Sequence, residues 1–309
     1  MKISICIPVY NGAKTIGPLV GKLKEELLMK YKIEIVLVND GSNDNSSEVC
    51  EILAKSDSLV KFINLSRNFG EHNAVMAGLN YCTGDCAVIM DDDFQTPPEE
   101  VSKLIAKLNE GYDVVFSSYE KKQHNVFRNI GSKFNNLIAT IMIKKPYNLY
   151  LSSFKVINRF LIDNIIKVKG PYPYVDGLIL RITRKYATVH VSHAKRVEGK
   201  SGYTLKKLIS LWLTTFTNFS VLPLRFATIT GFLFALISLC GAIFVIIEKI
   251  LDPSLPVGWS SLIVSLFLVA SVQMFAIGIV GEYLGRLFMK STDMPQFIVR
   301  DTFNNSKEI

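Results

Sequence analysis

Short apolar runs alternate with amphipathic stretches over residues 1–204. The apolar runs suit buried strands, which we expect at residues 3–9, 33–39, 61–65, 87–90 and 113–118. Helical spacing lies between or after them, at residues 15–29, 71–81, 97–108 and 133–143. Strands that end in polar turns and lead into helices are βα units, so we predict an α/β fold with a mostly parallel sheet and flanking helices. The carboxyl ends of the strands gather the functional groups in such a sheet.

Two apolar runs nearer the C-terminus are much longer. Residues 226–247 and 259–281 are each long enough to cross a bilayer as a helix. Before them, apolar residues accompany Lys206 and Lys207, which predicts an amphipathic helix in the membrane interface. We therefore expect four parts, namely a soluble domain at 1–204, the interfacial helix at 205–221, a transmembrane hairpin at 222–285 and a tail at 286–309.

The charge distribution supports a membrane hairpin. The net charge is +8, and many lysines and arginines lie just before or after the long apolar runs, whereas the connector between them carries only Glu248, Lys249 and Asp252. By the positive-inside rule, the soluble domain and both chain ends then face the cytosol. These cations suit anionic lipid headgroups, and no nucleic-acid recognition motif accompanies them. We expect no cleavable signal peptide, because Met1 leads directly into a strand.

The clearest chemistry follows the fourth predicted strand. Asp91, Asp92 and Asp93 stand in a row there, ahead of a proline pair that stops the extended run. Side chains two apart on an extended segment point the same way, so Asp91 and Asp93 can share a hard cation while Asp92 faces away. Gln95 adds a neutral oxygen. This set suits Mg²⁺ or Mn²⁺ held jointly with substrate phosphates, and the alternative is an acidic turn that caps the next helix.

Three further residues have both a functional and a structural interpretation. Asp40 ends the second strand and could accept hydrogen bonds from a base or ribose, or cap the next helix. His72 opens a helix and could act as a base, bind substrate or cap structure. Asp176 lies among apolar and aromatic residues, where a buried carboxylate requires a partner or a function. It is either an acceptor-side catalytic group or a structural hydrogen-bonding group.

Three basic residues are candidates for phosphate binding. Arg128 closes a polar segment that is either a loop near the phosphates or solvated surface. Arg196 and Lys200 lie in a glycine-containing turn ahead of the interfacial helix, where they could neutralise a diphosphate or a lipid phosphate. Their alternative role is ordinary juxtamembrane charge.

With these residues in place, the chain resembles the family 2 inverting glycosyltransferases of the GT-A fold. Within that family it is most similar to the polyprenyl-phosphate branch that includes dolichol-phosphate mannose synthase and the bacterial undecaprenyl-phosphate sugar transferases with two C-terminal spans. The motifs that carry the resemblance are Ile7-Pro8-Val9-Tyr10-Asn11, Val38-Asn39-Asp40-Gly41-Ser42, Arg67-Asn68-Phe69-Gly70, Met90 to Glu99, Gly199 to Tyr203, Pro223-Leu224-Arg225 and Gly281 to Arg286. The resemblance implies a nucleotide-diphosphate sugar as donor, a UDP-sugar in the first place, a divalent metal, and a polyprenyl phosphate as acceptor.

The resemblance also implies roles for single residues. The donor nucleoside is held by Pro8, Tyr10 and Asp40, and we expect Asn11, Asn68 and Asp92 on the donor side as well. The metal and the diphosphate are held by Asp91, Asp93 and Gln95. Arg196 lies near phosphate, and we add Arg128 and Lys200 to it.

Three positions depart from the family's pattern. Gly12 stands where many relatives carry Glu, so one donor contact is missing. The basic residue that often follows the strand ending at Ser118 is absent, and Lys121 or Lys122 could replace it. Ser153 stands where many relatives have an Asp that is sometimes assigned as a base.

The departure at position 153 bears on the acceptor. A polyprenyl phosphate is already largely ionised at neutral pH, since its second pKa is about 6. Its oxygen can therefore attack without first losing a proton. A sugar hydroxyl would need a base, and Asp176 is then the leading candidate.

We therefore expect an inverting glycosyltransferase of the bacterial plasma membrane that moves a sugar to undecaprenyl phosphate for cell-envelope glycan modification. The metal, Arg196 and Lys200 would stabilise the leaving diphosphate. One alternative is a transferase to a hydroxyl of a lipid-linked glycan, or a small polysaccharide synthase. Another is a membrane scaffold that binds a nucleotide sugar without turnover. Gly281 and Gly285 permit the spans to associate into a homo-oligomer without requiring it.

Overall fold

Two compact units make up the chain. The computed structural model describes residues 1–119, 146, 149–192, 229–234, 236, 237, 240, 243, 247, 251, 258–291 and 295–304. One unit consists of Met1–Tyr203 together with Asp293–Ile309, and the other of Thr204–Thr292. The last segment of the chain, which the sequence analysis treated as a tail, is thus part of the first unit.

The first unit is built on one sheet, which has eight strands within the described residues. In order across the sheet they are β7 (Tyr186–His190), β5 (Val114–Ser118), β6 (Lys155–Asn158), β4 (Cys86–Ile89), β1 (Lys2–Val9), β2 (Lys32–Asn39), β3 (Val60–Leu65) and β8 (Val299–Phe303). The strands β4, β1, β2 and β3 are parallel, as are β5 and β7, whereas β6 and β8 run antiparallel to their neighbours. The predicted mostly parallel sheet is confirmed, and β6, β7 and β8 are additions that the apolar runs did not predict.

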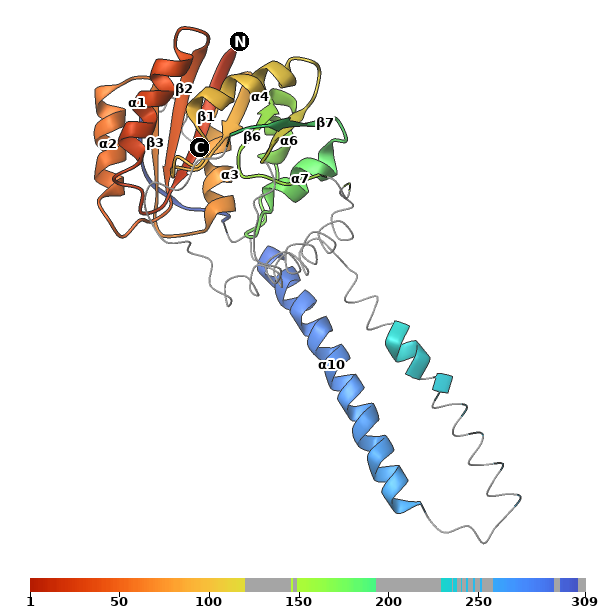
Figure 1. Cartoon of the computed structure of the whole chain (residues 1–309). Coiled ribbons are helices and arrows are strands. Elements are labelled where there is room, and N and C mark those ends of the chain that lie inside the picture. The colour runs from red at the N-terminus through yellow and green to blue at the C-terminus, as the bar shows by residue number, and fades with distance from the viewer. Residues whose placement is uncertain are drawn as a thin grey trace. The chain divides into compact units, whose positions relative to one another are not determined.

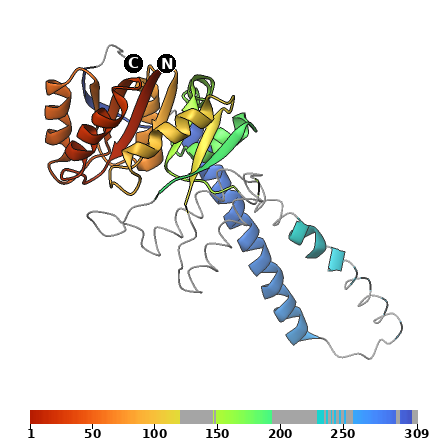
Figure 2. The same ribbon diagram turned by 45° about the horizontal axis from the view of Figure 1, so that its top comes forward.

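Helices cover both faces of this sheet (Figures 1 and 2). One face packs against α1 (Ile16–Leu27), α2 (Ser46–Ser56) and α4 (Val101–Leu108), which follows a 3₁₀ turn at Pro98–Glu100. The other face packs against α3 (Glu71–Tyr81), α6 (Arg159–Ile165) and α7 (Val175–Ile182). Within β1, Ile5 and Ile7 belong to the first core and Cys6 to the second. Burial on both faces explains why these strands are continuous apolar runs.

The second unit contains the long helix α10 (Trp259–Ser291), drawn in blue in Figure 1. Its stretch Leu268–Gly285 has 18 residues and a mean hydropathy of 1.5, so it is long and apolar enough to cross a membrane by length and composition. Among the described residues this is the one such stretch. Half of the span expected at 226–247 lies outside the described residues, and the interfacial helix expected at 205–221 lies wholly outside them.

A buried carboxylate connects the amino-terminal ends of the central strands. Glu34 on β2 is 3% exposed, and its oxygens accept hydrogen bonds from the Ser4 hydroxyl and from the Thr83 amide and hydroxyl, each at 2.6 Å. The ammonium groups of Lys2 and Lys61 lie 2.6 and 3.1 Å from Glu34 Oε2. Burial by itself would raise the pKa of Glu34, but the donors around it, Lys2 foremost, lower that pKa to about 2.

Replacement of Glu34 by Gln is expected to destabilise the first unit by about 3 kcal/mol, since the pKa is lowered from 4.5 to about 2 and one pKa unit corresponds to about 1.4 kcal/mol. The folded pKa of about 2 lies below the ordinary value of 4.5, so this contribution is complete above pH 4.5 and is lost as the pH falls toward 2. Urea unfolding followed by circular dichroism measures it. Glu51→Gln, which removes a surface pair with Lys55, is the control. Equal unfolding free energies of wild type and Glu34→Gln at pH 7 would contradict the assignment.

Candidate active site

Three polar loops meet at the carboxyl edge of the sheet. The strands β4, β1 and β2 are neighbours, so the segments that follow them, residues 90–97, 10–12 and 40–46, emerge next to one another. The pairing of Val9 with Asn39 aligns the ends of β1 and β2. The structure therefore brings the predicted metal and donor residues to one edge, where ligands of open α/β sheets usually bind.

Short polar contacts hold Asp91 and Asp93. The Ser153 hydroxyl donates to Asp91 Oδ2 at 2.6 Å, and the backbone amide of Gln95 donates to Asp93 Oδ1 at 3.0 Å. Phe94, which lies between Asp93 and Gln95, has a φ of 57°. This is a left-handed conformation that residues other than glycine adopt rarely. Such a conformation persists only where surrounding contacts maintain it, and it is often found at functional sites.

The donor set of this loop fits a hard divalent cation. Two carboxylates and the side-chain amide of Gln95 offer only oxygen ligands of the kind that Mg²⁺ and Mn²⁺ take. Within the part of the chain that the structure describes, no three His, Cys, Asp or Glu side chains form a metal-binding group. Two carboxylates leave coordination positions for substrate phosphates and water, which is how Mg²⁺ is usually held.

Asp92 faces a different neighbour. A Cβ added to Gly12 would lie 1.9 Å from Asp92 Oδ2, so this carboxylate occupies the space that a side chain at position 12 would need. Burial, with repulsion from Asp92 as the next cause, raises the pKa of Cys50 on α2 to about 12. Glycine at position 12 is required for this close approach. The departure of Gly12 from the family's pattern thus has a structural counterpart in the position of Asp92.

Asp40 joins the loop after β2 to the loop after β3. It is 3% exposed, and its two oxygens accept from the backbone amides of Phe69 at 2.7 Å and Gly70 at 2.9 Å. Burial raises the pKa of Asp40 in spite of these two bonds. Next to it, Gly41 has a φ of 61°, and a Cβ there would lie 2.4 Å from the backbone of Arg67. Asp40 does not occupy the N-cap of α2, and its contact with the donor stays a prediction.

Hydrogen bonds connect the loop after β1 to the loop after β2. The Asn11 amide donates to Ser42 Oγ at 3.0 Å, and Asn11 Oδ1 accepts from the Asn43 amide at 2.8 Å. The Asn43 side chain in turn donates to the Tyr10 hydroxyl at 3.4 Å. Tyr10 is 47% exposed, and Pro8 is half-buried at the end of β1. An exposed aromatic ring on a loop held in this way can contact a ligand at the edge of the sheet.

A buried ion pair lies on β6 and α7. Lys155 on β6 pairs with Asp176 in the first turn of α7, and their side chains are 5% and 10% exposed. The Lys155 ammonium also lies 5.7 Å from the centroid of the Phe116 ring. Two roles are predicted for Asp176, and the ion pair with Lys155 provides the partner that the structural role requires. A catalytic role for this residue stays a prediction.

Two titratable residues begin α3 close to this pair. The pKa of Glu71 is raised to about 7, first by burial of its carboxyl group and next by repulsion from Asp91, against the opposing charge of Lys155. His72 stacks edge-on against Tyr174 at 5.1 Å between ring centroids. Burial lowers the pKa of His72 to about 4, so this ring is neutral at neutral pH.

A hydroxyl network orients the segment that carries Ser153. The Ser117 hydroxyl donates to Ser152 Oγ at 2.7 Å, the Tyr119 hydroxyl lies 3.2 Å from the same atom, and the Phe154 amide donates to it at 3.2 Å. This network fixes Ser152, so the next residue presents its hydroxyl to Asp91. In the sequence Ser153 was only a missing carboxylate, whereas in the structure it is a hydrogen-bond donor to a predicted metal ligand.

The remaining predicted residues have varied outcomes. The basic residues Arg128, Arg196 and Lys200, with Lys121 and Lys122, lie outside the described residues. Asn68 is exposed on the loop after β3. Neither Lys155 nor Glu71 is among the residues predicted from the sequence. A lysine at the start of the apolar segment 155–158 is a signal that could have indicated a buried partner.

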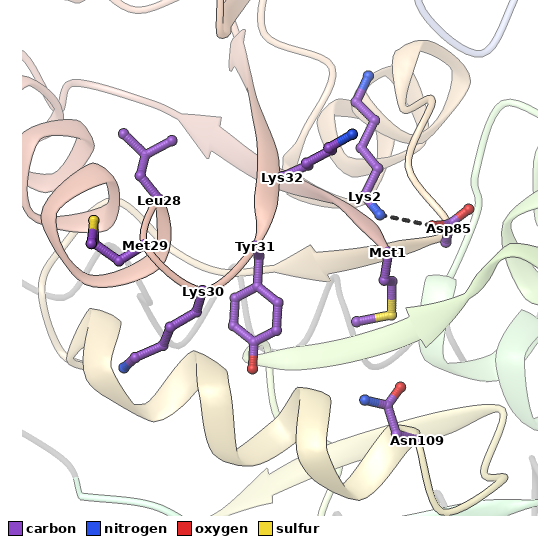
Figure 3. Close-up of a pocket in the computed structure, with 9 residues that line it drawn as sticks. All are labelled: Met1, Lys2, Leu28, Met29, Lys30, Tyr31, Lys32, Asp85 and Asn109. Carbon is purple, nitrogen blue, oxygen red and sulfur yellow. Dashed lines mark hydrogen bonds between the residues drawn. The ribbon is translucent and has the colours of Figure 1, made fainter.

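The hollow drawn in Figure 3 lies elsewhere, at the amino-terminal edge of the sheet. It is formed by Met1 and Lys2, residues 28–32, Asp85 and Asn109, and the Lys2 amide donates to Asp85 at 2.7 Å. None of the residues predicted to bind donor, metal or phosphate lines it. We therefore assign the candidate site to the carboxyl edge and not to this hollow.

Two solved structures illustrate the fold of this chain. Glucosyl-3-phosphoglycerate synthase from Mycobacterium tuberculosis, in complex with Mn²⁺, UDP-glucose and phosphoglyceric acid, superposes with a TM-score of 0.51 at 17% identity, over 70% of this chain and 76% of that protein. Mannosyl-3-phosphoglycerate synthase from Rubrobacter xylanophilus superposes with a TM-score of 0.54 at 16% identity, over 69% of this chain and 71% of that protein. At these identities the likeness concerns the fold alone.

Sequence relatives extend over almost the whole chain. An undecaprenyl-phosphate 4-deoxy-4-formamido-L-arabinose transferase of Proteus mirabilis is 31% identical over 303 residues, which are 97% of this chain and 93% of that protein. The uncharacterized glycosyltransferase YkcC of Bacillus subtilis is 32% identical over 306 residues, which are 98% of this chain and 94% of that protein. The family model described as Glycosyl transferase family 2 matches residues 4–166. The chain therefore belongs to glycosyl transferase family 2.

Proposed function

We propose that this enzyme transfers a sugar from a nucleotide-diphosphate sugar to a membrane polyprenyl phosphate, with undecaprenyl phosphate as the acceptor. The observation that carries the proposal is the relation to undecaprenyl-phosphate sugar transferases, which covers up to 99% of the chain and so includes α10 and β8. A fold likeness alone would leave the acceptor open, because GT-A proteins act on many acceptors.

On the donor side, the nucleoside lies at the loops that contain Tyr10, Asn11 and Asp40. The diphosphate lies at Asp91 and Asp93, together with a Mg²⁺ or Mn²⁺ ion, and Gln95 completes the set. When bound, this ion neutralises the charge that develops on the departing diphosphate. The fixed loops around these residues support the arrangement, since a donor held in one geometry reacts faster than a mobile one.

On the acceptor side, one phosphate oxygen attacks the anomeric carbon while the bond from that carbon to the diphosphate breaks. The electron pair leaves with the nucleotide diphosphate, so the anomeric carbon is inverted. An ionised phosphate has no proton to lose at this step. The hydroxyl of Ser153, bonded to Asp91, is consistent with a site that contains no base at this position.

The membrane assignment is part of the same proposal. The enzyme lies in the bacterial plasma membrane with its first unit in the cytosol, a proposal supported by the candidate span Leu268–Gly285 and by the basic residues on either side of the apolar region. A lipid phosphate acceptor is available at that surface. Cell-envelope glycan modification is the process that such a lipid-linked sugar would serve.

Incubation of the purified full-length protein with undecaprenyl phosphate, Mn²⁺ and a panel of labelled nucleotide sugars, beginning with UDP-sugars, tests the proposal. We expect label in the organic phase, released by mild acid as the free sugar, and an equal amount of nucleotide diphosphate. Label found only on a hydroxyl-bearing glycan would show that the acceptor is wrong. Binding of nucleotide sugar without release of the diphosphate would favour the scaffold alternative.

A further inference from the structure

A row of three polar side chains crosses the sheet beside the donor loops. Asn39 at the end of β2 pairs in register with Asn64 on β3, and Asn64 pairs in register with Asp301 on β8. The β3–β8 register shifts just after Asn64, a local irregularity of the kind that re-aims side chains. The C-terminal strand thus extends the row that begins at the predicted donor site.

Side-chain hydrogen bonds run along this row. The Asn39 side-chain amide donates to Asn64 Oδ1 at 2.8 Å, and the Asn64 side-chain amide donates to Asp301 Oδ2 at 3.4 Å. At the other end, Asn39 Oδ1 accepts from the backbone amide of Ser42 at 3.2 Å. Asn39 is 3% exposed, so an amide left without partners there would be costly.

The two ends of the row agree on its direction, since the Ser42 backbone amide can only donate and the Asp301 carboxylate can only accept. An ionised carboxylate only accepts hydrogen bonds, so Asn64 must turn its NH₂ group toward β8 and its carbonyl toward Asn39. Asn39 must then turn its NH₂ group toward Asn64 and its carbonyl toward Ser42. Each amide therefore has one favourable orientation, and the last of them holds the backbone of the loop after β2.

The loop at the end of this row carries donor residues. Ser42 accepts from the Asn11 amide at 3.0 Å, and Asn11 accepts from the Asn43 amide at 2.8 Å. Asp40 stands between Asn39 and Gly41 in the same loop. A change in the orientation of Asn39 would thus alter the hydrogen bonds that hold the loops after both β1 and β2.

Independent contacts hold β8 in place. The rings of Phe303 and Phe62 stack at 6.0 Å between centroids, and the Asn304 side chain donates to the carbonyls of Asp57 and Val60 at 3.1 and 3.0 Å. Gln296 donates to the Gly170 carbonyl at 2.8 Å. The position of Asp301 is therefore set by the packing of β8 and does not depend on its own bond to Asn64.

We propose that Asp301 and Asn64 are positioning residues for the nucleotide donor, which they influence through Asn39 and the Ser42 loop. The C-terminal strand β8, which follows α10 in the sequence, then helps to position the loops of the donor site. This inference rests on the proposed function, since it takes the loops after β1 and β2 as the place where the nucleoside binds.

A reversal of the row tests the inference. In Asn39→Asp, position 39 becomes acceptor-only like Asp301, so Asn64 cannot satisfy both of its neighbours. In the double variant Asn39→Asp/Asp301→Asn, the amide at position 301 donates to Asn64 and every partner is satisfied in the opposite direction. Asp301→Asn alone keeps a carbonyl for Asn64 to donate to. Thr302→Ala changes an exposed neighbour on the same strand and serves as the control.

The measurement is UDP binding with Mn²⁺ to the full-length protein in detergent, by titration calorimetry, with thermal unfolding of the same samples. We expect Asn39→Asp to weaken UDP binding roughly ten-fold, the size of effect of one unsatisfied buried polar group. Asp301→Asn should weaken UDP binding about three-fold, because it removes the acceptor-only group at one end of the row. Thr302→Ala, the control, should leave UDP binding unchanged. The double variant Asn39→Asp/Asp301→Asn should regain most of the affinity, whereas Asn39→Asp/Thr302→Ala should not.

The outcomes separate this inference from the proposed function. A double variant that binds UDP as weakly as Asn39→Asp would overturn the inference, and so would equal UDP affinity in all variants. Coupling seen only in thermal unfolding would also overturn it, because the row would then serve stability alone. Wild-type protein that binds no nucleoside diphosphate would instead count against the proposed function.

Discussion

Asp93→Ala is expected to lower the rate of sugar transfer at least about a thousand-fold, because the variant loses a proposed metal ligand and with it the neutralisation of the leaving diphosphate. Asp91→Ala should have an effect of the same order. Asp92→Ala should lose much less, about ten-fold, because the Asp92 carboxylate lies against Gly12 and affects the site through the β1 loop. The contrast between neighbouring residues follows from their contacts in a bent loop, where Asp92 lies against Gly12 while Asp91 and Asp93 accept from Ser153 and from the Gln95 backbone amide.

Initial rates of lipid-extractable label, measured across a range of Mn²⁺ concentrations, check this prediction. Glu99→Ala is a matched control, since Glu99 follows in the same acidic segment but pairs with Lys22 on the surface at 3.5 Å. A loss for Asp92→Ala as large as that for Asp93→Ala would show that all three carboxylates serve the reaction. Asp93→Ala with more than a tenth of the wild-type rate would exclude it as a metal ligand.

Lys155→Met is expected to destabilise the first unit by about 3–5 kcal/mol, because it leaves the Asp176 carboxylate buried without its cation. Asp176→Leu should lower the unfolding free energy by a similar amount, because it leaves the Lys155 ammonium buried without its carboxylate. The double variant Lys155→Met/Asp176→Leu removes both charges, and it should recover most of the lost stability. Unfolding of the four proteins in urea gives this cycle directly.

The same cycle decides between the two roles of Asp176. If the carboxylate serves only the buried pair, the folded double variant should transfer sugar to undecaprenyl phosphate within about ten-fold of wild type. A stable double variant without activity would assign Asp176 a part in the reaction and contradict a purely structural role. Asp163→Ala, which removes the more exposed partner of the i,i+4 pair with Arg159, is the control for a surface ion pair.

The local pattern of residues was sufficient to predict the central part of the fold. Strands buried on both faces are continuous apolar runs, which made β1 to β5 visible in the sequence. The acidic segment was equally clear, because three carboxylates at the end of a buried strand serve no packing purpose. The order of strands and polar turns then predicted which edge of the sheet carries the site.

Other strands had no such signal. The segment 299–303 is short and half polar, and it is stabilised by an edge whose residues stand far away in the sequence, as the bond between Asn64 and Asp301 illustrates. The short strand 155–158 was hidden because it begins with a lysine whose partner lies on α7. Pairings between distant segments depend on packing of the whole unit, which local propensity does not report.

By itself, the sequence determined the class of fold, the family and the types of side chain available for chemistry, because these depend on local pattern and residue identity. Only the tertiary structure decided the partners of those side chains. It directed both oxygens of Asp40 to backbone amides, turned Asp92 toward Gly12 and set the C-terminal strand beside Asn64. The physical reason is that a hydrogen bond or ion pair requires two groups within a few ångströms, and distance in space is set by the packed sheet and helices.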